Sequence, residues 1–182
     1  MVTTGLQLWL VRHGATDWSD AGWLNGWTDV PLNESGRAQA RRLAATLDST
    51  EFTRVWSSDL RRATETAKLA VGRSTPDRRL RELDFGRLEG LTWEQCPPDA
   101  QRALRDFDGF HAPDGESVAE LSRRVRDFVA ALTPGEHLVF THGGVIRVLL
   151  RDAGPDAQVM PGHVVRISVQ QPVRPEPPRD RR

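Results

Sequence analysis

Residues 6–18 read LQLWLVRHGATDW, and this stretch contains the features that decide the fold. The apolar run at its start predicts a buried β-strand, which ends directly before an Arg-His-Gly triplet that contains His13. Residues 137–147, HLVFTHGGVIR, have the same order, with a predicted strand before His142 and two glycines. Ligands of open α/β sheets bind at the carboxyl ends of strands. We therefore expect a functional site at these two junctions.

The rest of the chain alternates short apolar runs with amphipathic helical stretches. This alternation predicts an α/β fold, a three-layer α/β/α sandwich with a mostly parallel central sheet. The predicted strands are Leu6–Val11, Arg54–Ser57, His137–Thr141 and Val164–Val169, with a weaker candidate from Thr75 to Leu80. The predicted helices are one that begins near Ser35, one over Leu60–Ala70 with Asp59 as its N-cap, and one that begins after the capping-box residues Ser117 and Glu120.

Composition limits the classes of protein that remain. The chain has 182 residues, with 25 basic and 25 acidic side chains, and its formal net charge is zero. It therefore lacks the charge footprint of a nucleic-acid-binding protein, and any anion affinity must come from a local group of arginines. The single cysteine, Cys96, excludes an internal disulfide. No stretch approaches the roughly 20 apolar residues of a membrane helix, so we expect a cytoplasmic protein with no membrane partner.

One domain is expected over residues 1–170, with a short cap around residues 86–115. The last residues, 171–182, read QPVRPEPPRDRR, which predicts a flexible, solvated tail. The cap is expected to set specificity. Three arginines in or beside it are available for a second anionic group, although they could equally be solvated charges: Arg87, Arg102 and Arg105.

The two histidine junctions together favour phosphoryl transfer. A lone histidine at a strand end is more often structural, but a second strand–His–Gly junction far away in the sequence changes this interpretation. Imidazole has an unperturbed pKa of about 6.5, so a ring nitrogen can be neutral near pH 7 and attack phosphorus to form a phosphohistidine. The phosphoryl oxygens then need fixed positive charge. Arg12 offers a bidentate fork for them, and His142 offers a second cationic donor.

Several motifs carry a family resemblance. They are LVRHGATDW at 10–18, LNGWTDVPLNESGRAQA at 24–40, WSSDLRRATETA at 56–67, LRELDFGRLEG at 80–90, DGES at 114–117 and FTHGGVIR at 140–147. In this order they resemble the histidine phosphatase superfamily, which includes the cofactor-dependent phosphoglycerate mutases. The motifs extend from Leu8 to Leu150, whereas the Arg-His-Gly triplet alone would be a weak signal. The resemblance implies a phosphoglycerate mutase-like fold.

The resemblance also implies roles for individual residues. The expected catalytic residues are the nucleophile His13, the general acid Glu82, and Arg12, Arg62 and His142, which hold the phosphoryl oxygens. A leaving alkoxide departs poorly unless it is protonated, so a carboxylic acid within hydrogen-bond reach is required. Glu89 is the rival carboxylate. The motif position favours Glu82, and a structural role is expected for Glu89.

Substrate contacts are expected beside the catalytic residues, at Thr16, Ser19, Asn25, Gly26 and Gly143. Two positions depart from the family's pattern, because Ala15 stands where many members have Glu and Ser19 stands where many have Asn. Four tryptophans flank the motifs and are expected in the core and the pocket wall: Trp18, Trp23, Trp27 and Trp93. Of the histidines outside the motifs, His163 is the one expected within reach of the pocket.

Three functions remain open at this point. The mutases of the superfamily are longer, with an insertion after the acid motif, whereas here 59 residues lie between Glu82 and His142. A short cap should leave a phosphohistidine open to water, which favours a phosphatase over a mutase. A non-catalytic phospho-ligand-binding protein is the third alternative, and the intact catalytic residues argue against it. The expected partner is a small phosphorylated metabolite, with no metal and no cofactor, and the oligomeric state stays open.

Overall fold

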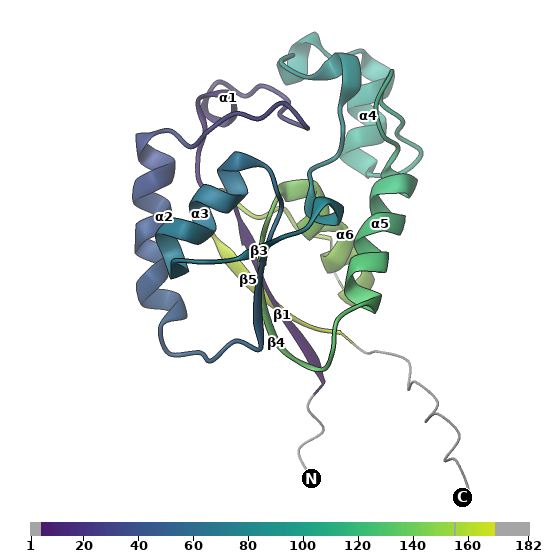
Figure 1. The fold of residues 1–182 in the computed structure, drawn as a ribbon. Coiled ribbons are helices and arrows are strands. Elements are labelled where there is room, and N and C mark those ends of the chain that lie inside the picture. Colours follow the sequence, from purple (N-terminus) through teal and green to yellow (C-terminus); the bar gives the residue numbers. More distant parts are fainter. Residues whose placement is uncertain (1–4, 155, 170–182) are drawn as a thin grey trace, which may run out of the picture.

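The computed structural model describes residues 5–154 and 156–169. Within these residues a five-stranded sheet forms the centre, in the order β3-β2-β4-β1-β5 (Figure 1). The strands are β1 (Leu6–Arg12), β2 (Arg54–Ser57), β3 (Thr75–Pro76), β4 (Gly135–Thr141) and β5 (Val164–Val169). The pairs β3–β2, β2–β4 and β4–β1 are parallel, and β5 is antiparallel to β1. The predicted, mostly parallel sheet is therefore confirmed.

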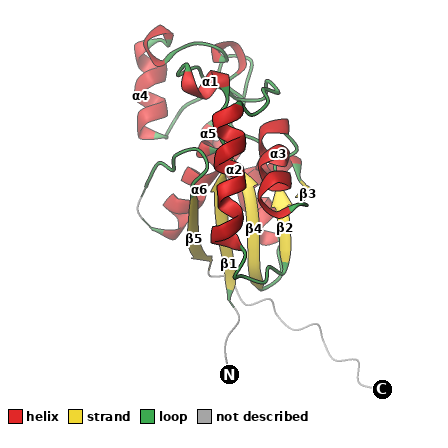
Figure 2. Ribbon diagram, turned by 90° about the vertical axis from the view of Figure 1, so that its left-hand side faces the viewer, coloured by secondary structure: helices red, strands yellow, loops and turns green. Residues whose placement is uncertain are grey.

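Helices cover both faces of this sheet (Figures 1 and 2). They are α1 (Asp17–Asp20), α2 (Glu34–Leu47), α3 (Arg61–Val71), α4 (Pro98–Asp106), α5 (Val118–Ala130) and α6 (Gly143–Ala153), with 3₁₀ turns η1 (Arg78–Leu80), η2 (Gly86–Leu88) and η3 (Trp93–Gln95). The pair α2 and α3 lies on one face, and α5 and α6 lie on the other. This arrangement confirms the α/β/α sandwich.

Alternating side chains along the central strands explain why an apolar core lies on each face of the sheet. Leu10 of β1 and Val139 of β4 belong to the core cluster that α5 and α6 complete. Val11 and Phe140, the next residues along, belong to the cluster that α2 and α3 complete. Successive side chains of a strand point to opposite faces, so strands buried on both faces read as continuous apolar runs. The strands β1 and β4 can therefore be recognised from the sequence alone.

Two helix starts follow from local capping chemistry. Ser117 caps α5, and its backbone N–H donates to the Glu120 carboxylate at 2.8 Å, so the predicted capping box is confirmed. The helix expected near Ser35 begins one residue earlier, because the Asn33 side chain accepts a hydrogen bond from the Gly36 N–H at 2.9 Å.

The predicted N-cap at Asp59 is wrong. The N-cap residue of α3 is Leu60, and it makes no side-chain capping bond. The Asp59 carboxylate instead accepts two hydrogen bonds from Arg81, from Nε and Nη2, both at 2.7 Å. A two-point charge-assisted contact is stronger than a single bond to a backbone N–H, so the distant arginine determines where this carboxylate points.

The weaker strand candidate over residues 75–80 is only partly a strand. Beyond Pro76 the chain turns into η1, and the Asp77 side chain accepts from the Arg79 N–H at 2.9 Å at its start. Proline has no N–H to donate to a neighbouring strand, and an aspartate favours a local turn. These two residues together limit β3 to its first two positions.

The sheet topology brings two strand ends to one place. The strands β1 and β4 are adjacent and parallel, with Arg12 opposite Thr141, so their carboxyl ends meet at one edge. Both α1 and α4 lie beyond this edge (Figure 1). Residues 86–115, where we expect a cap, contain η2, η3 and α4. The expected tail, 171–182, lies outside the described residues. No helix in the described part of the chain is long and apolar enough to cross a membrane.

Candidate active site

The two histidines that follow β1 and β4 lie side by side at the carboxyl edge of the sheet. His13 is 5% exposed and His142 is fully buried, and their ring centroids are 5.1 Å apart. The backbone N–H of His13 donates to the Thr141 carbonyl at 2.9 Å, which joins the two strand ends. The parallel pairing therefore brings together two junctions that are far apart in the sequence.

The ring of His13 has a defined tautomer. Its Nδ1 lies 2.8 Å from the carbonyl oxygen of Gly14. A carbonyl can only accept, so Nδ1 carries the proton and Nε2 keeps its lone pair. Burial lowers the pKa of His13 well below its ordinary value, and the positive charges of Arg62 and Arg12 lower it further. The ring is therefore neutral at pH 7, with a free lone pair at Nε2.

Two arginines supply positive charge around His13, of which Arg62 is buried and Arg12 is half-buried. Arg12 donates from Nη1 to the Val159 carbonyl at 2.8 Å, and Arg62, from α3, donates from Nη2 to the Gly26 carbonyl at 2.6 Å. Burial lowers the pKa of Arg62 to about 10, so it stays charged at pH 7. Within the described part of the chain, Nε of each arginine and both ring nitrogens of His142 are buried without a hydrogen-bond partner.

Unpartnered buried donors of this kind need an acceptor, and an anion would satisfy several of them at once. We call Arg12, His13, Arg62 and His142 the anion cradle. Burial also lowers the pKa of His142 well below its ordinary value, with the charge of Arg62 as the next cause. An entering anion would favour the protonated ring, because it compensates the positive charge of Arg62.

Glu82 lies beside the anion cradle and lines the same cavity as His13 and Arg12. Its carboxylate accepts from the N–H of Leu83 at 2.8 Å and from the N–H of Gly144, at the start of α6, at 3.0 Å. A Cβ atom on Gly144 would displace this carboxylate, so glycine at this position keeps Glu82 in place. A neutral imidazole, positively charged arginines and a carboxyl group therefore lie close together.

The sequence profile of the "Histidine phosphatase superfamily (branch 1)" matches residues 8–167. The chain belongs to the histidine phosphatase superfamily. The "Probable phosphoglycerate mutase GpmB" of Yersinia enterocolitica is 37% identical over 157 residues, which are 80% of this chain and 73% of that protein. The family that the sequence motifs resemble is thus confirmed.

Solved structures of the superfamily have the same fold. A phosphoglycerate mutase of Thermus thermophilus has a TM-score of 0.83 and 43% identity, with 91% of this chain and all of that chain covered. A candidate alpha-ribazole-5'-P phosphatase of Escherichia coli has a TM-score of 0.79 and 28% identity, with 92% of each chain covered. Members of the superfamily thus include proteins described as mutases and proteins described as phosphatases.

The expected substrate contacts of this superfamily member divide into two groups. Ser19, Asn25 and Gly143 line the cavity, whereas Thr16 and Gly26 are not among its lining residues. The Thr16 hydroxyl accepts from the Ser19 N–H at 3.0 Å and caps α1, and the Gly26 carbonyl accepts from Arg62. These two residues therefore hold α1 and Arg62 in place and do not line the cavity themselves. The amide of Asn25 is buried and has no hydrogen-bond partner within the described chain.

His163 and the three arginines of the expected cap are not among the lining residues of the cavity. The ring of His163 is exposed and lies 3.1 Å from the Pro161 carbonyl, outside the cavity lining. Arg87 forms an ion pair with Asp114 at 2.9 Å on the surface. The remaining arginines of the expected cap, Arg102 and Arg105, are exposed and are not lining residues either.

The cavity is also lined by residues that the sequence did not single out, and Arg147 is the charged one among them. Arg147 of α6 lies four residues after Gly143, on the same face of the helix. This spacing was visible in the sequence once the helix start had been placed at the site. Among the described residues, no group of three or more His, Cys, Asp or Glu is placed to hold a metal ion.

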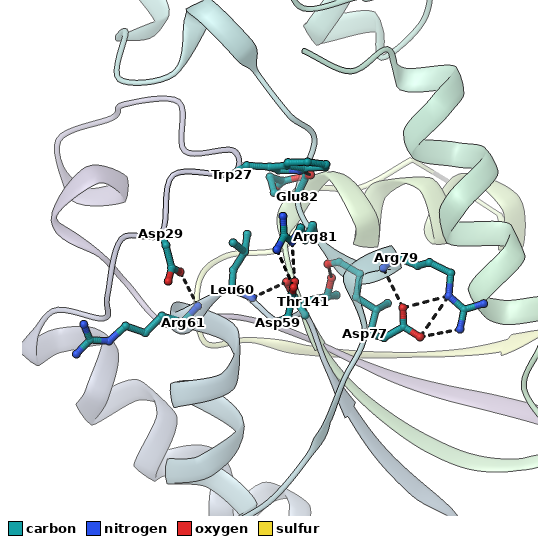
Figure 3. A network of polar contacts seen from close by, with 12 residues as sticks. Trp27, Asp29, Asp59, Leu60, Arg61, Asp77, Arg79, Arg81, Glu82 and Thr141 are labelled. Carbon is teal, nitrogen blue, oxygen red and sulfur yellow. Dashed lines mark hydrogen bonds and ion pairs between the residues drawn. The ribbon is translucent and has the colours of Figure 1, made fainter. Parts of the chain in front are cut away.

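A polar network fixes the segment that carries Glu82 (Figure 3). Arg81 binds Asp59 and lies over the ring of Trp27 at 4.9 Å, and Trp27 donates from Nε1 to the Glu82 carbonyl at 2.8 Å. The hydrogen bond from Arg81 also lowers the pKa of the Asp59 carboxyl. Glu89 instead accepts from the backbone N–H groups of Trp27 and Thr28, so it holds the loop before α2.

Proposed function

We propose that this protein is a metal-independent phosphomonoester hydrolase that forms a phosphohistidine on His13. The observation that carries the proposal is the state of that ring, which is neutral, holds its proton on Nδ1 and lies in the cavity that Arg12 and Glu82 also line. A nucleophile, fixed positive charge and a proton donor are the parts that phosphoryl transfer needs.

Two displacements complete the reaction. In the first, Nε2 of His13 attacks phosphorus, the ester P–O bond breaks, and a protonated Glu82 gives its proton to the departing oxygen. The ring is then a cation, and the Gly14 carbonyl accepts a charge-assisted hydrogen bond from its Nδ1–H. In the second, the Glu82 carboxylate takes a proton from a water molecule whose oxygen attacks phosphorus. The P–N bond breaks, its electron pair returns to Nε2, and inorganic phosphate leaves.

The arginines contribute by position and charge, and the neutral ring of His142 contributes by position, as a hydrogen-bond donor. The phosphoryl oxygens carry most of the charge of the transition state, and donors held in place before the reaction need no reorganisation. Arg12 and Arg62 are held by backbone carbonyls, so their charge is not neutralised by those contacts. The proposed ligand of this site is a small phosphorylated metabolite, and the proposal includes neither nucleic acid nor a cofactor.

A mutase is the second candidate, because the Yersinia relative is named as one. In a mutase the phosphoryl group returns from His13 to another hydroxyl rather than to water. The short stretch of 59 residues between Glu82 and His142 supports hydrolysis, since little chain is available to cover the phosphohistidine.

The test measures phosphate release and the intermediate together. Purified protein mixed briefly with labelled phosphomonoester and quenched in alkali should carry acid-labile label on His13. His13→Ala should lower turnover by about 10⁴-fold or more, and His163→Ala, an exposed control outside the cavity, should keep it. Conversion of 3-phosphoglycerate to 2-phosphoglycerate faster than phosphate release would establish the mutase instead. Label on another residue type would refute both.

A further inference from the structure

The wall of the active-site cavity beyond the anion cradle is apolar and mainly aromatic. The cavity has a volume of about 340 Å³, and its wall includes Trp23, Phe85, Trp93 and Phe107, together with Leu24 and Leu104. These side chains come from the loop after α1, from the segment after Glu82, from η3 and from α4 and its end. The wall is therefore assembled from separate parts of the chain.

Trp23 is the most accessible ring of this wall. It is 42% exposed, although large apolar side chains are usually buried. Its orientation is fixed, because the ring of Trp18 packs against it edge-on at 5.6 Å and its backbone forms a bridge with Thr92. A fixed, partly exposed indole beside a phosphoryl site is a contact surface for an apolar group of a ligand.

Among the described residues that line the cavity, none offers an uncommitted cation for a second anionic group of the substrate. Arg12 and Arg147 are the two arginines among the described lining residues, and Arg12 belongs to the anion cradle. Arg147 donates from Nε and Nη2 to Asp156 at 2.8 and 2.7 Å, and from Nη1 to the Leu104 carbonyl at 2.9 Å. Its guanidinium also lies over the ring of Phe107 at 4.5 Å. Arg147 is thus a neutralised part of the wall.

Neutral polar side chains are also few in this lining. They are Ser19, Asn25 and Gln158. The Ser19 hydroxyl accepts from the Thr16 N–H at 2.8 Å and donates to the Thr16 carbonyl at 2.9 Å, so its bonds are already made. The side-chain amides of Asn25 and Gln158 remain as neutral polar partners. A carboxylate or a second phosphate placed against this wall would lose water without gaining an uncommitted cation among the described lining residues, which is unfavourable.

We propose that the substrate is a phosphomonoester whose alcohol part carries an aromatic or branched apolar group and no second anionic group. This proposal rests on the proposed function and names the substrate class of the same site. The phosphoryl group occupies the anion cradle, and the apolar group packs between Trp23 and Trp93. Phosphoglycerates and sugar bisphosphates are excluded, because their second charge would be buried without a partner.

The test compares primary alkyl esters, so that the leaving groups need protonation to a similar degree. The substrates are 2-phenylethyl phosphate, ethyl phosphate and 3-phosphoglycerate. We expect kcat/KM for 2-phenylethyl phosphate to exceed that for ethyl phosphate by at least about 10-fold, the lower limit for one methylene in an apolar pocket. The value for 3-phosphoglycerate should fall below both.

Two variants locate the effect. Trp23→Ala and Trp93→Ala should each reduce the ratio of kcat/KM between the phenylethyl and ethyl esters toward 1. Met160→Ala is the control, because Met160 is 65% exposed and lies outside the cavity lining, and it should keep the wild-type ratio. A ratio near 1 in the wild-type protein would overturn this proposal, and so would 3-phosphoglycerate as the best substrate. In either case the release of phosphate would still support the proposed function. Failure to hydrolyse any ester would overturn both.

Discussion

Replacing Glu82 by glutamine should slow the hydrolysis of alkyl phosphates far more than that of aryl phosphates. The variant removes the proton that a departing alkoxide needs, and general acids typically contribute about 10²–10⁴-fold. Such a loss corresponds to roughly 2.7–5.5 kcal/mol of transition-state stabilisation. Nitrophenyl phosphate should lose less than about 10-fold, because its leaving group departs as an anion without a proton.

The geometry around Glu82 separates this chemical loss from structural damage. Both N–H groups that it binds, those of Leu83 and Gly144, donate to the same oxygen, Oε1, at 2.8 and 3.0 Å. A glutamine can present its amide oxygen there, so both bonds survive. The second oxygen accepts only the longer contact from Gly144, at 3.1 Å. Losing this contact should cost about 1 kcal/mol of stability, the usual net value of one hydrogen bond.

Glu89→Gln is the matched control. Its carboxylate binds the N–H groups of Trp27 and Thr28 and the Thr28 hydroxyl, so the variant should unfold at lower denaturant concentration. Its ratio of alkyl to aryl hydrolysis should equal that of the wild type. Selective loss of alkyl hydrolysis in Glu89→Gln, with Glu82→Gln unaffected, would show that the general acid is Glu89. Equal losses on both ester types in Glu82→Gln would mean that Glu82 positions the substrate.

Three further predictions follow from the same geometry. Activity should survive exhaustive chelation, and a strict requirement for added magnesium or zinc would contradict the mechanism. Vanadate should inhibit, because it mimics the five-coordinate transition state. Burial holds the pKa of His13 and His142 well below 6.5, so the unfolded chain binds more protons below about pH 6.5. The stabilisation that the two neutral rings provide is therefore present above that pH and is lost on acidification. Tm measured between pH 8 and 5 should fall less in His13→Gln than in the wild-type protein. Asp59→Ala should lower the unfolding free energy by about 1.5–3 kcal/mol, because it removes two charge-assisted hydrogen bonds from Arg81. An unchanged denaturant midpoint would show that the network in Figure 3 does not stabilise the fold.

The sequence predicts the parts of the fold that depend on local patterns. The strands β1 and β4 are buried on both faces and therefore read as unbroken apolar runs, and the capping box at Ser117 has its partner three residues away. The pairing of β1 with β4 then brings His13 and His142 together, which the repeated strand–His–Gly order indicates. Local pattern and parallel topology are sufficient for this part of the site.

Contacts between distant residues limited the remaining predictions. Asp59 looks like a helix cap in the sequence, and only the fold places Arg81 against its carboxylate. The roles of Thr16 and Arg147 depend in the same way on side-chain direction. Thr16 turns to cap α1, and Arg147 turns to Asp156 and to the carbonyls of α4. A motif gives the identity of a residue but not the partner that competes for its side chain.

The groups that hold His13, Arg12 and Arg62 are main-chain oxygens. The carbonyl of Gly14 sets the tautomer of His13, and those of Val159 and Gly26 hold Arg12 and Arg62. No side-chain substitution removes a carbonyl, so a scan of single mutations would pass over these contributors without a signal. Access to them comes from backbone chemistry, such as replacement of one peptide link by an ester, which weakens the carbonyl as an acceptor and leaves every side chain unchanged. The same replacement removes the N–H of the next residue, which after Gly14 and Gly26 donates to Gln39 and Glu89.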